Sequence, residues 1–366
     1  MSSRRYRLLV MSVGSLVGSA LIESLEAMGR DRFELIGMNS APDAINNFRV
    51  DTCHLSPVAA SRDALIAFLD RRVERDQPDL IVPTRDDDVV ALARWAARRP
   101  RNMHHVATMV GSVAIAEMLR DKWESYVWAT RNGLPFARSA IDAEGAQALV
   151  RQVGFPLIAK PRKGFASIGV RMLLDASHVH AALAAGDMIV QAPIDPSPML
   201  TADALRAGMP LWFAPVQPGS PLTLCVLDDD GPTFVAAWGS KHMRGAAFDT
   251  RLLRDDALQR LAMAYGEAAW RDGWRGLFNI QARRAASGEW TPIELAGRFM
   301  GGTNALHALG VPVAGIVFRR FIAGFDVTFV QAPDHDAQAL KQAATFLVRD
   351  EDVSRLRDTG VWHAPR

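Results

Sequence analysis

Residues 158–170 read Ile-Ala-Lys-Pro-Arg-Lys-Gly-Phe-Ala-Ser-Ile-Gly-Val, which predicts a strand that opens into a loop. Lys160 lies in the strand. The loop holds small and basic residues, namely Lys163, Gly164, Ala166, Ser167 and Gly169. Small residues let backbone N–H groups form an anion-binding nest, and lysine adds a compact positive charge. The loop therefore fits a polyphosphate, and a hairpin with a solvated basic tip is the alternative.

Lysine is rare in this chain, which sharpens the interpretation of the loop. Of the 42 Lys and Arg residues only five are lysines, and two of the five lie at Lys160 and Lys163. Arginine serves wherever a planar guanidinium is sufficient. The presence of two of the five lysines in this short segment indicates a need for a compact ammonium group.

Length and composition set the class of protein. The chain has 366 residues, 49% of them hydrophobic and 22% charged, with a formal net charge of +2. These values predict two or three packed domains rather than a disordered chain. The charges are mixed in sign along the sequence, so no nucleic-acid footprint is expected. Cys53 and Cys225 are far apart without metal-ligand spacing, which favours a reduced, cytoplasmic protein.

The N-terminus has some features of a signal peptide. Arg4-Arg5 precedes an apolar run from Leu8 to Ile22, but Gly14 and Gly18 interrupt that run. Glu23 and Glu26 then follow at helical spacing, so a strand, a turn and a helix are expected instead. We expect no membrane-spanning segment elsewhere, because no stretch is sufficiently long and apolar.

Strands and helices alternate in the first part of the chain. Strands are expected at 6–13, 33–38, 80–83 and 105–108, with helices at 19–28, 62–75 and 86–98. This alternation predicts an α/β unit whose parallel sheet is covered on both faces. The turn at 14–18 lacks the three-glycine spacing of a dinucleotide site, and Asn39 replaces the expected acid. Nicotinamide binding is therefore the weaker alternative.

Pro83-Thr84-Arg85-Asp86-Asp87-Asp88 follows the strand at Leu80. Acids at a helix start interact favourably with the helix dipole, so simple capping by Asp86 is one interpretation. The other interpretation is a ligand site, because the carboxyl ends of strands in α/β proteins bind ligands.

The second part of the chain predicts helices followed by an antiparallel sheet. Helices are expected at 121–131, 143–153, 175–185 and 254–272, and strands at 188–191, 200–205, 211–216, 222–227, 233–240, 277–283 and 290–295. Residues 241–245 are expected to form a basic, flexible loop. In the tail, strands are expected at 318–321 and 326–330 and a helix at 336–347.

The strands expected at 277–283 and 290–295 predict a hairpin in which Gln281 and Glu294 face each other. An amide and a carboxylate in this arrangement can hold Mg²⁺, with phosphate oxygens completing the shell. Arg298 follows and can neutralise charge on a transferring phosphoryl group. A structural Glu–Arg ion pair across the hairpin is the alternative.

Taken in order, these features resemble the ATP-grasp enzymes, and most closely the branch related to the large chain of carbamoyl phosphate synthetase. The resemblance covers nearly the whole chain and is strongest from Asp121 to Gly302. It implies an α/β fold with a Rossmann-like N-terminal domain at 1–110. An α+β ATP-grasp unit then follows, with a small lid subdomain at 111–187 and a large subdomain with an antiparallel sheet at 188–366.

The same resemblance implies roles for individual residues. Lys122 and Lys160 would contact the phosphates of ATP, and the lid loop would close over them through Lys163, Gly164, Phe165, Ala166 and Ser167. The hinge, Gln191, Ala192, Pro193 and Ile194, would face adenine, and Asp203 is a candidate ribose contact. Gln281 and Glu294 would bind Mg²⁺, or Mn²⁺ in its place. Arg298, Lys241 and Arg244 would stabilise the reacting phosphate.

One departure from the family pattern concerns the metal site. The pattern Glu-x-Asn-x-Arg reads Glu294-Leu295-Ala296-Gly297-Arg298 here, so alanine replaces an asparagine ligand. The expected function is an ATP-dependent ligase that joins a small-molecule carboxylate to an amine or another nucleophile such as a thiol. A non-catalytic ATP-binding protein of the same fold is the alternative. A homodimer is the expected assembly.

Overall fold

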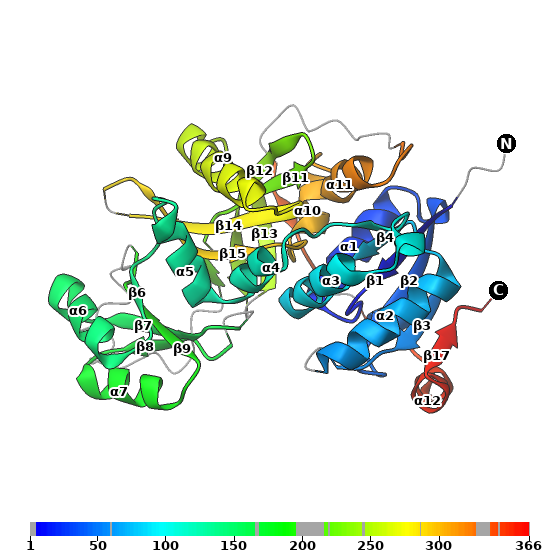
Figure 1. Cartoon of the computed structure of the whole chain (residues 1–366), viewed down its shortest axis with the longest axis horizontal. Coiled ribbons are helices and arrows are strands. Elements are labelled where there is room, and N and C mark those ends of the chain that lie inside the picture. The colour runs from blue at the N-terminus through cyan, green and yellow to red at the C-terminus, as the bar shows by residue number, and fades with distance from the viewer. Residues whose placement is uncertain are drawn as a thin grey trace.

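The computed structural model describes residues 5–58, 61–164, 168–194, 216–218, 220–243, 246–285, 287–326, 337–342 and 345–365. Three sheets organise these residues. Figure 1 shows the small sheet of β6 to β9 at one end, the N-terminal sheet at the other, and the large antiparallel sheet between them. None of the helices in the described part of the chain has the length and apolarity needed to cross a membrane.

The N-terminal sheet has the strand order β17-β3-β2-β1-β4-β5. Its strands are β1 (Tyr6–Val10), β2 (Phe33–Asn39), β3 (Thr52–Leu55), β4 (Leu80–Val82), β5 (Ala107–Thr108) and β17 (Val361–His363). The first five are parallel; four of them were predicted, whereas β3 was missed, and β17 is antiparallel to β3. The strand order reverses between β2 and β4 on either side of β1, which places a topological switch point at the β1/β4 edge.

Helices cover both faces of the N-terminal sheet because its strands are apolar on both sides. Leu9 and Ile81 pack with α2 (Arg62–Asp76) and α3 (Asp86–Arg98) in one core. Leu8 packs on the opposite face with α1 (Leu16–Ala27) and α11 (Val313–Phe321). The continuous apolar strands and the two helical layers confirm the predicted α/β unit.

The small sheet has the order β6-β9-β7-β8 and is antiparallel. Its strands are β6 (Ser139–Ala140), β7 (Leu157–Pro161), β8 (Arg171–Leu173) and β9 (Met188–Gln191), with helices α6 (Ala143–Val153) and α7 (Ala176–Ala184). Asp142 and Asp175 cap the two helices by accepting hydrogen bonds from backbone N–H groups in their first turns. Before this sheet lie α4 (Val113–Arg120) and α5 (Lys122–Arg131), and Asp121 caps α5.

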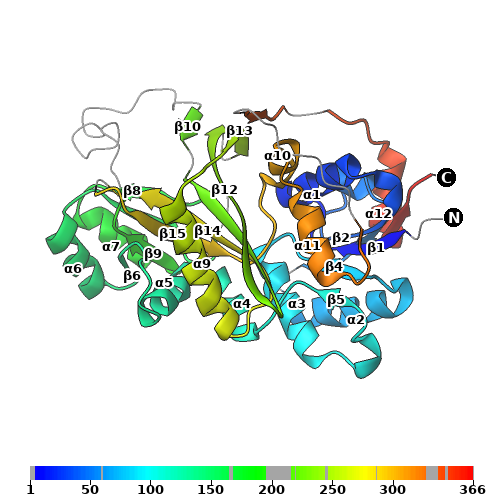
Figure 2. The same ribbon diagram turned by 90° about the horizontal axis from the view of Figure 1, so that it is seen from above.

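The large sheet has the order β15-β14-β11-β12-β13-β16, and β10 also pairs with β12. Its strands are β10 (Val216–Pro218), β11 (Leu222–Asp228), β12 (Gly231–Met243), β13 (Ala246–Leu252), β14 (Gly276–Arg284), β15 (Trp290–Ala296) and β16 (Ala339–Leu340). One face packs against α9 (Asp256–Arg271). The other face packs against α10 (Thr303–Ala308) and α11, which Figure 2 shows between the large sheet and α1.

The two larger sheets share a core through α11. Phe318 of α11 contacts Phe33 of β2 and Phe299, with ring centroids 6.4 and 6.3 Å apart. Leu224 and Trp238 of the large sheet belong to the same buried cluster. The N-terminal sheet therefore packs against the large sheet through a shared buried core.

Several predictions for the second part of the chain were wrong. Residues 318–321 are helical, because Val313, Val317 and Phe318 place an apolar stripe against the core. The expected helix at 336–347 contains β16, which pairs with β13. β12 continues to Met243 and β13 begins at Ala246, so the expected loop at 241–245 is largely strand.

Other predictions fall partly or wholly outside the described residues. The strands expected at 200–205 and 211–216 lie outside them except for Val216, which begins β10. The strand expected at 326–330 lies outside them after Asp326. The tail also includes α12 (Asp350–Thr359) and β17, which sequence reasoning missed.

The domain boundaries at 110 and 187 remain proposals. Strand pairing places β9 with the small sheet and β17 with the N-terminal sheet.

Candidate active site

Two lysines from different elements converge on the large sheet. Lys160 lies on β7, and its Nζ donates a hydrogen bond to the Ile293 carbonyl of β15 at 2.8 Å. Lys122 begins α5, and its Nζ lies 3.3 Å from Oε1 of Glu294. Both lysines are buried. The site thus forms where the small sheet and α5 approach the edge strand β15.

Glu294 and Gln281 face each other across the β14–β15 hairpin, in the predicted register. Both side chains are partly exposed. Their carboxylate and amide oxygens are hard donors of the kind that Mg²⁺ binds, so the residues present fit that ion. Lys122 already places a cation beside the Glu294 carboxylate. No group of three or more His, Cys, Asp or Glu residues that could hold a metal occurs among the described residues.

The charge on Lys160 is not fully compensated. The pKa of Lys160 is lowered to about 8, chiefly by burial, while the Glu294 carboxylate acts to raise it and the charges of Lys122 and Arg283 act to lower it. A buried ammonium whose nearest hydrogen-bond acceptor is a backbone carbonyl remains poorly balanced. The position therefore favours an incoming anion.

The loop after β7 is tied to α5. The Gly164 carbonyl accepts a hydrogen bond from Lys122 Nζ at 2.8 Å. Arg162 pairs through two hydrogen bonds with Asp121, and Lys163 Nζ lies 3.9 Å from the same carboxylate. Gly169 has a φ of +78°, a conformation that glycine adopts readily. Phe165, Ala166 and Ser167 lie outside the described residues.

The expected hinge follows β9. The buried Gln191 donates from Nε2 to Ser139 Oγ at 3.1 Å, so this part of its amide is used within the small sheet. The backbone N–H of Ala192 donates to Arg138 at 2.9 Å. Ile194 packs against the apolar core, and Pro193 lies between these two residues. The contacts of this hinge with adenine remain a prediction, and Asp203 lies outside the described residues.

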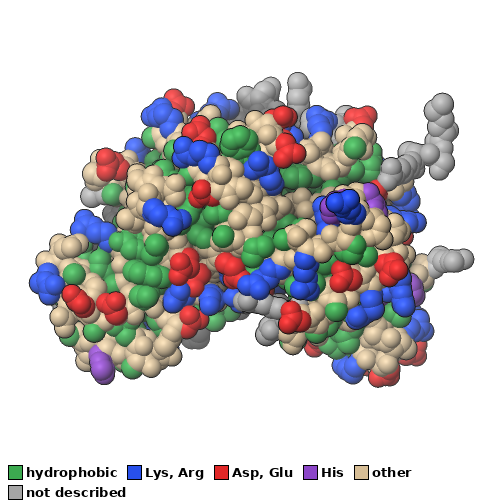
Figure 3. All heavy atoms as spheres, viewed as in Figure 1, with side chains coloured by type: hydrophobic (Ala, Val, Ile, Leu, Met, Phe, Trp, Pro, Cys, Tyr) green, Lys and Arg blue, Asp and Glu red, His purple; other side chains and the backbone are tan. Residues whose placement is uncertain are grey.

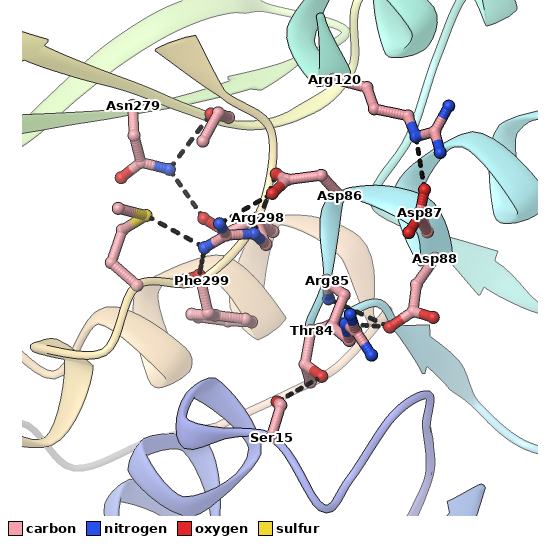
Figure 4. A network of polar contacts seen from close by, with 12 residues as sticks. Ser15, Thr84, Arg85, Asp86, Asp87, Asp88, Arg120, Asn279, Arg298 and Phe299 are labelled. Atoms are coloured by element: carbon pink, nitrogen blue, oxygen red, sulfur yellow. Dashed lines mark hydrogen bonds and ion pairs between the residues drawn. The ribbon is translucent and has the colours of Figure 1, made fainter. Parts of the chain in front are cut away.

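Arg298 lies after β15 and is held by the N-terminal domain (Figure 4). Its Nε and Nη2 donate to the two carboxylate oxygens of Asp86, both at 2.9 Å. Its Nη1 donates to the Phe299 carbonyl at 3.2 Å and to the Met300 sulfur at 3.4 Å. Burial alone would lower the pKa of Arg298, but the Asp86 carboxylate outweighs it and raises the pKa above its ordinary value.

The three acids at the start of α3 have three different partners. Asp86 pairs with Arg298, Asp87 pairs with Arg120, and Asp88 accepts from the Arg85 N–H at 3.0 Å. Capping by Asp86 was therefore the wrong assignment, because the third acid supplies the cap. Burial raises the pKa of Asp88 to about 6, although its hydrogen bond from Ser12 acts to lower it. Arg298 is thus bound to Asp86, which disfavours the alternative of a structural ion pair between Glu294 and Arg298.

Lys241, one of the basic residues expected to stabilise the reacting phosphate, is not brought together with this site. Lys241 lies on β12, three strands from β15 in the sheet order, and its Nζ is 3.2 Å from Asp249 of β13. Arg244 lies outside the described residues. In the space-filling view, acids and bases of both signs rim the hollow between the two end lobes (Figure 3).

The turn after β1 is filled by asparagine side chains. Asn46 Nδ2 donates to the Val13 carbonyl at 3.0 Å and to Ser19 Oγ at 2.8 Å. A Cβ on Gly14 would lie 2.4 Å from the Asn39 amide nitrogen. Side chains therefore pack closely around the turn where the glycine-rich dinucleotide fingerprint would lie, which disfavours the nicotinamide alternative.

No protein-family model matches the sequence, and no curated protein matches it. Solved structures do. The biotin carboxylase domain of 2-oxoglutarate carboxylase from Hydrogenobacter thermophilus, in complex with MgADP, ADP and bicarbonate, has a TM-score of 0.62 at 13% identity. The match covers 90% of this chain and 72% of that chain.

Two further structures show the same likeness. An L-amino acid ligase from Bacillus licheniformis has a TM-score of 0.62 at 12% identity, over 90% of this chain and 76% of that chain. N5-carboxyaminoimidazole ribonucleotide synthetase from Thermotoga maritima has a TM-score of 0.60 at 15% identity, over 89% of this chain and 78% of that chain. The three sheets and these neighbours together show that this chain has the fold of the ATP-grasp superfamily.

Proposed function

We propose that this protein is an ATP-dependent ligase that activates a small-molecule carboxylate as an acyl phosphate. The observation that carries the proposal is the convergence of Lys122 and Lys160 on Glu294, at the junction of the small and large sheets. A buried, poorly compensated lysine beside a carboxylate–amide pair fits a polyphosphate with its divalent cation. The fold neighbours with bound nucleotide support this assignment.

The chemistry explains why ATP is needed. A carboxylate is a poor acyl donor, because its oxygen is a bad leaving group. The substrate carboxylate attacks the γ-phosphorus, the bond to the bridging oxygen breaks, and ADP leaves. The amine nitrogen then attacks the acyl carbon, loses a proton, and phosphate departs with the electron pair of the C–O bond. The products are an amide, ADP and phosphate, and a thiol is the alternative nucleophile.

The residues of the candidate site have different roles in this reaction. Lys122 and Lys160 bind and orient the phosphates, while the loop at 163–169 excludes water from the acyl phosphate. Gln191, Ala192 and Ile194 face the adenine. Arg298 offsets the charge that develops during phosphoryl transfer.

Glu294 and Gln281 would hold Mg²⁺, or Mn²⁺ in its place. The ion supplies neutralisation of the phosphate charge. Arg244 and Asp203 complete the proposal as further contacts to the reacting phosphate and the ribose, whereas Lys241 pairs with Asp249 and is not assigned to the site. The assembly we propose is a homodimer, and the H. thermophilus neighbour is itself a dimer.

Release of ADP tests the proposal. Purified protein is incubated with ATP, Mg²⁺ and a panel of acids crossed with amines and thiols, and ADP is measured by a coupled assay. We expect ADP release that requires both an acid and a nucleophile and that disappears in Lys160→Met. Nucleotide-dependent thermal stabilisation without ADP release from any pair would favour the non-catalytic ATP-binding alternative. Absence of any nucleotide effect would rule out both.

A further inference from the structure

We propose that Asp86 is a positioning residue for Arg298, so that the N-terminal sheet helps to build the phosphate site. This inference rests on the proposed function. Asp86 lies at the first position of α3, 212 residues before its partner in the sequence. It does not belong to any of the nucleotide or metal contacts assigned above. Its role follows from how completely the structure fixes Arg298.

The backbone around Arg298 is fixed first. The buried Asn279 donates from Nδ2 to the carbonyl of Arg298 at 2.7 Å and to that of Ala296 at 3.3 Å. Gly297 lies so close to its neighbours that a Cβ would be 2.6 Å from the Trp274 ring and 2.8 Å from Leu119. The turn that follows β15 therefore has one packed conformation.

The guanidinium is fixed next. Asp86 engages Nε and Nη2, while Nη1 is engaged by the Phe299 carbonyl and the Met300 sulfur. These contacts use four of the five N–H donors of an arginine. Among the residues that the structure describes, the second hydrogen of Nη2 has no partner, so one donor remains for a ligand. Arg298 thus offers its charge and a single N–H in a fixed direction.

The surrounding charges keep this arrangement without a ligand. Asp86 lies at the N-terminus of α3, where the helix dipole favours a carboxylate. Glu294 and Asp88 also lie near enough to Arg298 to contribute to its raised pKa. A donor that is oriented before the reaction needs no reorganisation when phosphate charge develops. Losing the carboxylate would free the guanidinium to adopt other rotamers, which weakens that effect.

The neighbouring residue provides a matched control. Asp87 lies in the same turn of α3 and pairs with Arg120 at the end of α4. Its loss removes one ion pair from the same helix start without touching Arg298. A purely structural role for Asp86 predicts that both substitutions act alike on stability and leave nucleotide binding unchanged.

The experiment measures dissociation constants for ADP and for the β,γ-imido analogue of ATP, both with Mg²⁺. Their ratio isolates the contribution of the γ-phosphate. The proteins are the parent, Asp86→Asn, Asp87→Asn, Arg298→Gln and the double variant Asp86→Asn/Arg298→Gln. We expect Asp86→Asn to weaken the preference for the ATP analogue about tenfold, which corresponds to about 1.4 kcal/mol. Asp87→Asn should leave the preference unchanged.

The double variant shows whether Asp86 acts through Arg298. In the Arg298→Gln background, Asp86→Asn should have no further effect on the preference, because the shared interaction is already lost. If Asp86→Asn does not fold, Asp86→Glu replaces it. The longer carboxylate displaces the guanidinium, so the preference should fall here too.

Three outcomes would overturn the inference. If Asp86→Asn leaves the preference for the ATP analogue over ADP unchanged, the Asp86–Arg298 pair has only a structural role. If the preference becomes stronger, Asp86 competes with phosphate for Arg298. Both leave the proposed function intact, because the parent still binds nucleotide. A parent protein that binds neither nucleotide removes the proposed function and this inference together.

Discussion

Lys160 and Arg298 are two buried cations that interact with the charge of Glu294, and their surroundings shift their pKa values in opposite directions. Lys160 donates to a backbone carbonyl, and its burial lowers its pKa to about 8. Arg298 is bound through two hydrogen bonds to Asp86, and its pKa is raised above the ordinary value. One cation is left for an incoming anion, whereas the other is already compensated. The difference indicates that Lys160 contributes affinity for the nucleotide phosphates, whereas Arg298 contributes an N–H donor of fixed orientation.

The contrast has a physical basis in the two side chains. Ammonium is a compact, strongly hydrated charge whose pKa changes readily on burial, whereas guanidinium stays protonated and pairs through a planar fork. A lysine at the phosphate position can therefore respond to ligand and pH. An arginine that must hold one orientation requires a carboxylate on its fork, which Asp86 provides.

The largest effect we expect is on stability, from Arg298→Met. This change leaves the Asp86 carboxylate without its partner, and breaking a buried ion pair costs about 3–5 kcal/mol. Because Asp86 is partly exposed to water, we expect about 3 kcal/mol, the lower end of that range. Denaturant unfolding monitored by circular dichroism gives the value. If the variant unfolds at the parent's midpoint, the Asp86–Arg298 pair contributes nothing to the free energy of unfolding. Arg298 would then be no better compensated than Lys160.

Lys160→Met should stabilise the folded protein in the absence of ligand. Removing a desolvated ammonium while keeping the side-chain volume should raise the melting temperature. The pKa of Lys160 is lower in the folded than in the unfolded state, so the parent gains stability relative to the variant as pH rises from 8 to 10.

The same variant should lose its response to nucleotide. At a ligand concentration of 100 Kd, binding stabilises a protein by about 2.7 kcal/mol, and this increment should disappear. The measurement is the melting temperature with and without Mg²⁺ and ATP. Lys341→Met, on the tail, is the control for a lysine outside the site. An equal nucleotide shift in the Lys160 variant and the parent would remove Lys160 from the site.

Much of this arrangement can be predicted from the sequence, because it depends on local patterns. The alternation of apolar runs predicted the parallel sheet, and the spacing of Gln281 and Glu294 predicted their register across the hairpin. The placement of Lys160 on a strand followed from its apolar neighbours.

Contacts that depend on docking could not be predicted in the same way. Asp86 and Arg298 are far apart in the sequence, and nothing near either residue specifies its partner. β17 returns from the tail to β3, because a short strand is stabilised only where an open sheet edge accepts it. Lys241 was placed in a loop because its neighbours are basic and polar, yet pairing with β13 keeps it in a strand.

Nucleotide affinity should depend on pH through Lys160. The unliganded pKa of about 8 means that the ammonium loses its proton within an accessible range. Phosphate groups are already ionised above pH 7.5, since their second pKa is about 6. Affinity should therefore be constant up to about pH 8 and fall by up to tenfold per pH unit above it. Titration calorimetry from pH 7.5 to 9.5 measures this, and Lys160→Arg should give a flat profile. A parent profile as flat as that of the arginine variant would contradict the assignment.

The smallest effect we expect is a shift of that profile in Glu294→Gln. Glu294 acts to raise the pKa of Lys160, so its loss should move the fall in affinity to lower pH. The same change removes a charged ligand from the proposed Mg²⁺ site, so half-maximal nucleotide binding should need more free Mg²⁺. Glu289→Gln is the control, because this exposed residue lies between β14 and β15 on the same hairpin. A profile that moves without a change in the Mg²⁺ requirement would keep Glu294 beside Lys160 but remove it as a metal ligand. If neither quantity changes, Glu294 interacts with Lys122 alone, through the contact at 3.3 Å. Lys160 and Arg298 then do not share the Glu294 carboxylate.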